Sequence, residues 1–262
     1  MTRIYIGCCG LPRGKERYFK VFKAVELQNT FYELPTVDEA KSFRASIPSD
    51  ATITMKAWQV ITHPSTSPTW KRMKRKPSGN LANYGFLKPT QENFNAWKEV
   101  LAIARTFAAT FIVLQTPPSF GYSEENLRNV VQFFNTIERD GIYIGWEPRG
   151  SWKDHREAIS KVVTTCNIVH VTDILRVDPV EESIKLGVIY IRLHGLGGSE
   201  VNYRYRYTDE DLRKLAEKIR LFIETYNVKT VYVFFNNIYM FDDAKRFRDI
   251  CTEVVKDLAE II

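Results

Sequence analysis

The stretch VIYIRLH (188–194) has the two-residue period of a β-strand. Isoleucine and leucine at positions 189, 191 and 193 form one apolar face, and the opposite face carries Arg192 and His194. Successive side chains of a strand point to opposite sides of a sheet, so the apolar face is expected to pack against a core. A cation and an imidazole on the other face indicate a ligand site or an internal ion pair.

Other segments of the chain have the same strand character. They are short, rich in β-branched and aromatic residues, and separated by helical or loop-like sequence. Together with 188–194 they make eight predicted strands, at 4–9, 24–29, 52–58, 110–115, 143–148, 167–173 and 230–236.

Helical sequence with recognisable N-caps lies between these strands. Helices are predicted after Thr36, Thr90, Ser123 and Thr208, and acidic residues follow Ser123 and Thr208 as expected at a helix start. The proline-containing connection at 174–187 predicts a degenerate helix after the sixth strand.

The repeated alternation of strand and helix determines the predicted fold class. Strands separated by helices pair in parallel, and eight such units predict an α/β fold, a single (β/α)8 TIM-like barrel. An open doubly wound sheet is the alternative, but the first strand is not followed by its G-x-G-x-x-G turn. We expect one domain over 1–262, with a basic loop insertion at about 63–89 over the C-terminal face.

Composition narrows the functional classes. The 262 residues carry a formal net charge of +6, which favours an anionic partner. No segment reaches the roughly 18 apolar residues of a membrane span, and the N-terminus enters a strand at once, so we expect a cytoplasmic protein without a membrane partner. The four cysteines have no paired C-x-x-C spacing and are expected to be reduced thiols.

The phase of the strands predicts which side chains point into the barrel. In each strand the apolar positions are assigned to the helix side, and the alternate positions therefore face the axis. Many of these are polar or reactive and lie near C-terminal strand ends, where TIM-barrel enzymes have their active sites. The inward set is Cys9, Glu26, Gln28, Lys56, Trp58, Gln115, Glu147, Arg149, His170, Arg192, His194 and Asn236. Buried ion pairs that only stabilise the barrel are the alternative interpretation.

Six motifs, in order along the chain, carry a family resemblance. They are ELQNTFYELP (26–35), MKAWQVITH (55–63), LQTPPSF (114–120), WEPRGSW (146–152), YIRLHG (190–195) and VYVFFNN (231–237). Together they resemble the YecE-like family, domain of unknown function 72, and the resemblance covers essentially the whole chain. It implies a TIM-like barrel, and the similarity of that fold to endonuclease IV and sugar isomerases suggests phosphodiester or sugar chemistry. The motif residues that the resemblance singles out are Glu26, Asn29, Tyr32, Lys56, His63, Gln115, Glu147, Arg149, Arg192, His194, Asn236 and Asn237.

Two loops add positive charge at the expected mouth of the barrel. The first carries a basic cluster beside Trp70, and the second, NYRYRY (202–207), alternates arginine with tyrosine. Arginine binds phosphate and aromatic rings stack on bases, so both loops are candidate nucleic-acid contacts. A solvated charged surface and a packed extended edge are the respective alternatives. The candidate contacts are Lys71, Arg72, Lys74, Arg75, Lys76, Arg204 and Arg206.

These residues define a leading hypothesis of phosphodiester hydrolysis on an anionic substrate, with DNA or RNA as candidates. Lys56, Arg149 and Arg192 would neutralise the phosphate, and Asn29, Trp58, His63, Gln115, Asn236 and Asn237 would line the site. Glu26 or Glu147 would activate water or hold a divalent metal, and His194 would protonate the leaving oxygen.

The cofactor and the reaction stay open. His63, His170 and His194 with Glu26, Glu147 and Asp173 could supply metal ligands, although the spacings H-x-H and H-E-x-x-H do not occur.

Two alternatives remain beside the hydrolase. One is a protein that binds nucleic acid or another anionic ligand without turnover. The other is a glycan-active enzyme that uses Glu26 and Glu147 as its carboxylates, with Trp58, Trp146 and Trp152 as sugar platforms.

Overall fold

The computed structural model describes residues 1–198 and 200–262, and the chain folds into two compact units. Unit 1 consists of Met1–Glu26, Asp50–Thr52 and Val169–Ile262. Unit 2 consists of Leu27–Ser49 and Ile53–Ile168.

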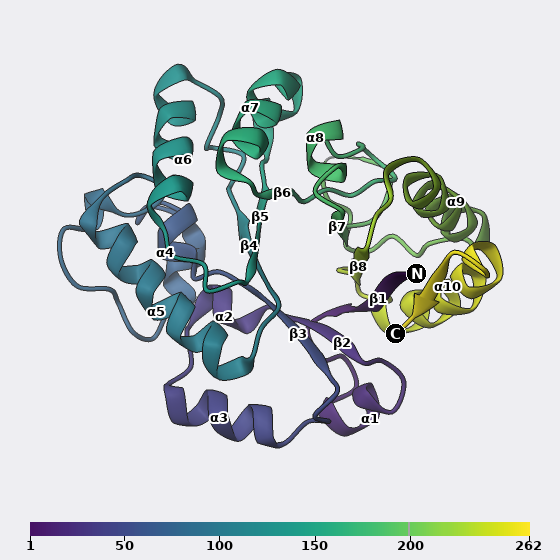
Figure 1. Cartoon of the computed structure of the whole chain (residues 1–262). Coiled ribbons are helices and arrows are strands. Elements are labelled where there is room, and N and C mark those ends of the chain that lie inside the picture. The colour runs from purple at the N-terminus through teal and green to yellow at the C-terminus, as the bar shows by residue number, and fades with distance from the viewer. Residues whose placement is uncertain (199) are drawn as a thin grey trace. The chain divides into compact units, whose positions relative to one another are not determined.

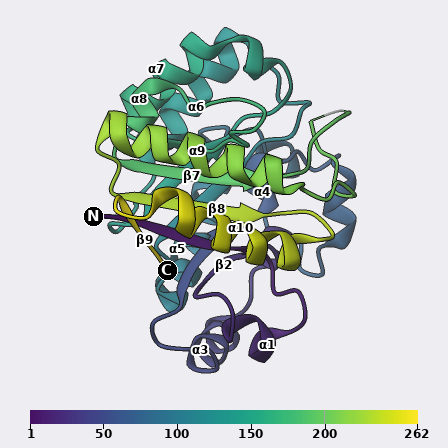
Figure 2. The ribbon, with the colours of Figure 1, turned by 90° about the vertical axis from the view of Figure 1, so that its right-hand side faces the viewer.

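The strands of unit 1 are parallel. Its sheet contains β2 (Ala24–Leu27, whose last residue belongs to unit 2), β1 (Thr2–Cys9), β8 (Thr230–Phe235) and β7 (Val188–Leu193), in that order. The short β6 (Val169–His170) precedes a bridge between Thr172 and Ile191 of β7. A further strand, β9 (Ala259–Ile261), pairs with β1, which brings the two ends of the chain close together (Figure 2).

Two long helices, α9 (Asp209–Tyr226) and α10 (Met240–Val255), pack side by side in this unit (Figure 1). The predicted N-cap Thr208 is present at the start of α9, where it forms a capping box with Asp211. The one-turn α8 (Glu181–Ile184) is the expected degenerate helix after β6, and α1 (Lys15–Phe19) follows β1.

Unit 2 contains the parallel neighbours β3 (Thr52–Lys56, whose first residue belongs to unit 1), β4 (Phe111–Gln115) and β5 (Tyr143–Glu147). Thr36, Thr90 and Ser123 each accept a backbone N–H at a helix start, as predicted. The α-helices are α2 (Asn29–Tyr32), α3 (Val37–Ala45), α4 (Gln59–Thr62), α5 (Gln91–Phe107), α6 (Glu124–Thr136) and α7 (Arg156–Cys166). The 3-10 helices are η1 (Pro68–Arg72), η2 (Leu81–Asn83) and η3 (Gly150–Asp154).

The parallel pairing and the alternation of strands with helices confirm the predicted α/β fold of the (β/α)8 TIM-barrel class. The expectation of one domain with a loop insertion stays a prediction. Several strand boundaries were wrong, because the chain enters a helix soon after the strand: Asn29 begins α2 and Trp58 is the N-cap of α4. The predicted sixth strand shrinks to two residues.

The apolar face of β7 is buried as its sequence predicts, with Ile189, Ile191 and Leu193 in the core. The face with Arg192 is buried too, so this strand places a guanidinium inside the protein. Among the helices formed by residues 1–198 and 200–262, none combines the length and the apolar character needed to cross a membrane.

Candidate functional site

Glu26 and Arg192 form a buried two-point ion pair in unit 1. The Nε of Arg192 lies 2.9 Å from Oε2 of Glu26, and its Nη2 lies 2.9 Å from Oε1. The hydroxyl of Tyr190 donates a third hydrogen bond to Oε2, at 2.9 Å. The exposed fractions of the Arg192 and Glu26 side chains are 1% and 0%. Bidentate geometry is the strongest form of this interaction, and burial keeps both charges away from solvent.

Cys9 lies beside this pair because the register of β1 places it next to Glu26 in β2. The Nη2 of Arg192 donates to its Sγ at 3.9 Å. Burial, with the charge of Glu26 as a second cause, raises the pKa of the Cys9 thiol well above its ordinary value. Cys9 is therefore a protonated core thiol rather than a nucleophile.

His194 follows β7 directly and is held at two points. Its backbone N–H donates to Oδ2 of Asp173 at 3.2 Å, and its ring Nδ1 lies 3.1 Å from Nδ2 of Asn236. An amide nitrogen is a donor, so in this hydrogen bond Nδ1 is the acceptor and Nε2 is the ring nitrogen that carries hydrogen. The arrangement orients an N–H donor at the C-terminal end of β7.

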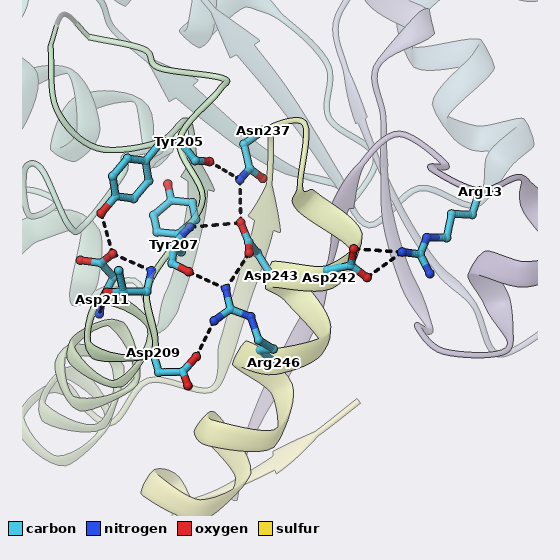
Figure 3. A network of polar contacts seen from close by, with 10 residues as sticks. Arg13, Tyr205, Tyr207, Asp209, Asp211, Asn237, Asp242, Asp243 and Arg246 are labelled. Atoms are coloured by element: carbon cyan, nitrogen blue, oxygen red, sulfur yellow. Dashed lines mark hydrogen bonds and ion pairs between the residues drawn. The ribbon is translucent and has the colours of Figure 1, made fainter.

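Asn237 belongs to a polar network that joins the end of β8, the segment before α9 and the first turn of α10 (Figure 3). Its Nδ2 donates to the Tyr205 carbonyl and to Oδ2 of Asp243, both at 2.7 Å. The backbone N–H of Tyr207 also donates to Oδ2 of Asp243, and Arg246 donates to Oδ1 at 2.8 Å. The amide nitrogen that was expected to bind substrate thus holds the 202–207 segment.

The same segment folds back onto the end of β7 at Gly195. This glycine has φ +83°, and a Cβ there would overlap the carbonyl oxygen of Asn202. The Gly195 N–H donates to the phenolic oxygen of the buried Tyr207 at 2.7 Å. Arg204 and Arg206 stay exposed on this segment, and the guanidinium of Arg206 lies 5.6 Å from the ring centroid of Tyr239.

Lys56, Gln115 and His63 come together around Phe31 in unit 2. The Lys56 ammonium donates to Oε1 of Gln115 at 2.8 Å and lies 3.8 Å from the centroid of the Phe31 ring. The His63 ring packs edge-on against the same phenylalanine at 4.9 Å. Burial, and secondarily the charge of Lys56, lowers the pKa of His63 to about 3. His63 is therefore neutral at physiological pH.

Glu147 and Arg149, at the end of β5, form a second ion pair in unit 2. Glu147 is buried and Arg149 is partly buried. The two arginines expected to neutralise a phosphate, Arg149 and Arg192, each have a carboxylate partner inside their own unit.

The remaining predicted contacts of unit 2 differ in accessibility. Asn29 is exposed at the start of α2, whereas Trp58 is 0% exposed. Trp146 and Trp152 are buried as well, and their indole nitrogens donate to Thr116 and to the Phe120 carbonyl. The glycan-active alternative thereby loses its three proposed sugar platforms.

The basic cluster of the long loop is exposed, and part of it is anchored. Arg72 stacks 3.7 Å over the Tyr32 ring, and Arg75 lies 4.9 Å over Trp58. Arg75 also pairs with Glu99 at 2.6 Å. The carboxylate of Glu33 accepts the backbone N–H groups of Lys74 and Arg75 at 2.9 and 3.2 Å. The stretch itself contains no acid, and Glu33 and Glu99 come from other segments of unit 2.

The histidines and carboxylates predicted as metal ligands do not form a cluster in the described residues. Across residues 1–198 and 200–262, no group of three or more His, Cys, Asp or Glu side chains is arranged to hold a metal ion. Of the candidate ligands, His170 accepts the Val180 N–H through Nδ1, and Asp173 accepts the His194 N–H.

The structure adds residues to the set that the sequence indicated. Asp243, Arg246 and Tyr205 hold the segment 202–207. Asp173, which the sequence indicated only as a metal ligand, accepts the backbone N–H of His194. Asp243 lies within a run of ordinary helix sequence, so its burial and its partners could not be recognised without the packing of α10.

These features define a parallel (β/α)8 protein with polar side chains at the ends of its strands. A family model described as a protein of unknown function, DUF72, matches residues 12–259. The chain belongs to this family, as the motif resemblance predicted.

Solved structures support the same assignment of fold. A DUF72 family protein from Thermotoga maritima is 22% identical, with a TM-score of 0.66, and the match covers 95% of this chain and 98% of that one. One from Enterococcus faecalis is 16% identical, with a TM-score of 0.68, and the match covers 98% of both chains. Endonuclease IV from Thermus thermophilus shares the fold at 11% identity and a TM-score of 0.51, over 98% of this chain and 100% of that one. No curated protein matches the chain in sequence.

Proposed function

We propose that this chain binds a nucleic-acid-like polyanion through the basic segment Lys71–Lys76. The observation that carries the proposal is the exposure of five cations within six residues. In the part of the chain that the structure describes, the ammonium groups of Lys71, Lys74 and Lys76 form no ion pair. They can therefore contact phosphate without first breaking an internal interaction.

The aromatic anchoring of this segment supports the proposal. The guanidinium of Arg72 is stacked on Tyr32, and stacking leaves the N–H edges of an arginine available for a phosphate. The hydrogen bonds from the backbone N–H groups of Lys74 and Arg75 to Glu33 hold the backbone of the loop in place beneath its cations. A preorganised row of cations binds a polymer of phosphates with less loss of entropy than a flexible one.

Binding is tested with a fluorescent single-stranded oligonucleotide and its anisotropy. The triple variant Lys71→Ala/Lys74→Ala/Lys76→Ala should bind at least about 10-fold more weakly, since each lost phosphate contact weakens binding. The matched control replaces the exposed Lys20, Lys98 and Lys256 by alanine, which changes the net charge equally. Equal affinities of the two triple variants would show that this segment is not the site.

Phosphodiester hydrolysis is the second candidate, and the geometry of His194 favours it. With Nδ1 accepting from Asn236, the ring presents Nε2–H as a hydrogen-bond donor, which could stabilise the negative charge that develops on the leaving oxygen as water adds to phosphorus. The two carboxylates expected to activate water, Glu26 and Glu147, are each paired with an arginine, and we therefore rank hydrolysis behind binding. The fold shared with endonuclease IV makes a nuclease assay the natural first experiment.

The two candidates are separated by His194→Ala. A hydrolase should lose cleavage of a labelled oligonucleotide by roughly 100-fold or more while it retains binding. A wild-type protein that binds the oligonucleotide and leaves it intact would exclude hydrolysis of that substrate and keep the binding function.

A further inference from the structure

Three of the large exposed hydrophobic side chains belong to two adjoining loops of unit 1. Tyr203, Ile238 and Tyr239 have exposed fractions of 47%, 63% and 37%. The Ile238 N–H donates to the Tyr203 carbonyl at 2.9 Å, which joins the loop after β7 to the loop after β8. We call these three side chains the tyrosine platform. Isolated exposed hydrophobic residues are ordinary, whereas a contiguous group marks an interaction site.

The backbone beneath the platform is held by buried polar contacts. Asn237, directly before Ile238, is buried and donates both to the Tyr205 carbonyl and to Asp243 (Figure 3). Asp243 is itself buried and bound by Arg246. The network therefore fixes the backbone beneath the platform. Both tyrosine rings remain partly exposed, and that of Tyr203 packs edge-on against His194 with ring centroids 6.1 Å apart.

Positive charge borders the platform. Arg204 and Arg206 are exposed on the same loop, and Arg206 lies over the Tyr239 ring. Among residues 1–198 and 200–262, neither arginine has an ion-pair partner. Exposed rings beside unpaired guanidinium groups match a ligand that has flat apolar faces and phosphates, which is the chemistry of single-stranded nucleic acid.

We propose that the tyrosine platform stacks unpaired bases of single-stranded nucleic acid, with Arg204 and Arg206 on the adjoining phosphates. This inference rests on the proposed binding of a polyanion and adds that the ligand is recognised through its bases. A single strand is the expected form, because the faces of bases in a duplex are already stacked on one another.

The test compares a single-stranded oligonucleotide with an abasic phosphodiester of equal length and charge. Tyr203→Ala and Tyr239→Ala should each weaken binding of the base-containing strand by roughly 5- to 150-fold, the range found for loss of one base-stacking ring. Binding of the abasic strand should change little. Tyr203→Phe should retain affinity because it keeps the ring, and Tyr143→Ala, at a site that is 48% exposed in unit 2, is the matched control.

The outcomes separate this inference from the binding function. If wild-type protein binds both polymers equally and the alanine variants bind as wild type does, the platform is not a base site while polyanion binding stands. If wild-type protein binds neither polymer, both proposals fail. Thermal midpoints of the variants must match that of wild type, and the substitutions preserve the Ile238–Tyr203 bond because it uses backbone atoms.

Discussion

Arg192 and Glu26 neutralise each other through two hydrogen bonds of 2.9 Å, and neither side chain is accessible to solvent. They lie 166 positions apart in the chain, on β7 and β2. A pair of this kind stabilises only as a unit, because removal of one partner leaves a buried charge without compensation.

Glu26→Gln should therefore lower the free energy of unfolding by about 3 to 5 kcal/mol. The double variant Glu26→Gln/Arg192→Met removes both charges and should recover part of that loss. Urea denaturation followed by circular dichroism measures both values. A Glu26→Gln variant as stable as wild type would show that the pair does not support the fold.

The pKa of His63 predicts how stability depends on pH. In the unfolded chain this imidazole takes up a proton below its ordinary pKa of 6.5, whereas in the folded chain it does so only near 3. The unfolded state thus binds more protons between these values, so the contribution of His63 to stability is complete above about 6.5 and is lost as the pH falls toward 3.

His63→Asn should consequently flatten the pH profile of the unfolding free energy between about pH 3 and 6.5 relative to wild type. His155→Asn is the control, because His155 is exposed. Parallel profiles for wild type and His63→Asn would contradict the assignment of His63 as a buried neutral imidazole.

The cysteines should be inert in the native protein. All four are buried free thiols, and burial raises the pKa of Cys166 to about 11 and that of Cys251 to about 12. Cys8 and Cys9 are shifted in the same direction, also mainly by burial. Ellman's reagent at pH 8 should react slowly with folded protein and rapidly with four thiols per chain in denaturant. Rapid native reaction of any thiol would contradict the packing described.

The strand phase could be predicted because the alternation of apolar and polar residues is a local property of the sequence. Arg192 lies between Ile191 and Leu193, so its side chain has to lie on the other face of β7. Its partner could not be predicted, since nothing local to residue 192 specifies that Glu26 lies opposite. Arg192 was expected to neutralise a phosphate, and in the structure it forms an internal ion pair with Glu26.

Helix starts were predicted correctly where the N-cap residue has a side chain that favours capping, as at Thr36 and Thr208. The helices α7 and α10 were missed because they begin after His155 and Tyr239, which are weak N-cap residue types. The anchoring of the basic loop was missed for a different reason: Glu33 and Glu99 approach it only through tertiary folding.

The hydrogen bonds around Asp243 should keep the segment 202–207 rigid. Asp243→Ala removes the acceptor for Asn237, Tyr207 and Arg246 and should cost about 1 to 3 kcal/mol. The amide of Tyr207 should also exchange faster with deuterium. Asp242→Ala is the control, because its ion pair with Arg13 is half exposed and is expected to contribute about 0 to 1 kcal/mol (Figure 3). Equal effects of the two substitutions would refute the role assigned to Asp243.

Polyanion binding by the Lys71–Lys76 segment is tested most directly by the salt dependence of oligonucleotide affinity. The logarithm of the association constant should fall linearly with the logarithm of the salt concentration, because bound phosphates release counterions. The slope for Lys71→Ala/Lys74→Ala/Lys76→Ala should be shallower by about 2 in total, at about 0.7 per lost contact with a single strand. An affinity that does not change with salt, or a slope that the three substitutions leave unchanged, would contradict the proposed function.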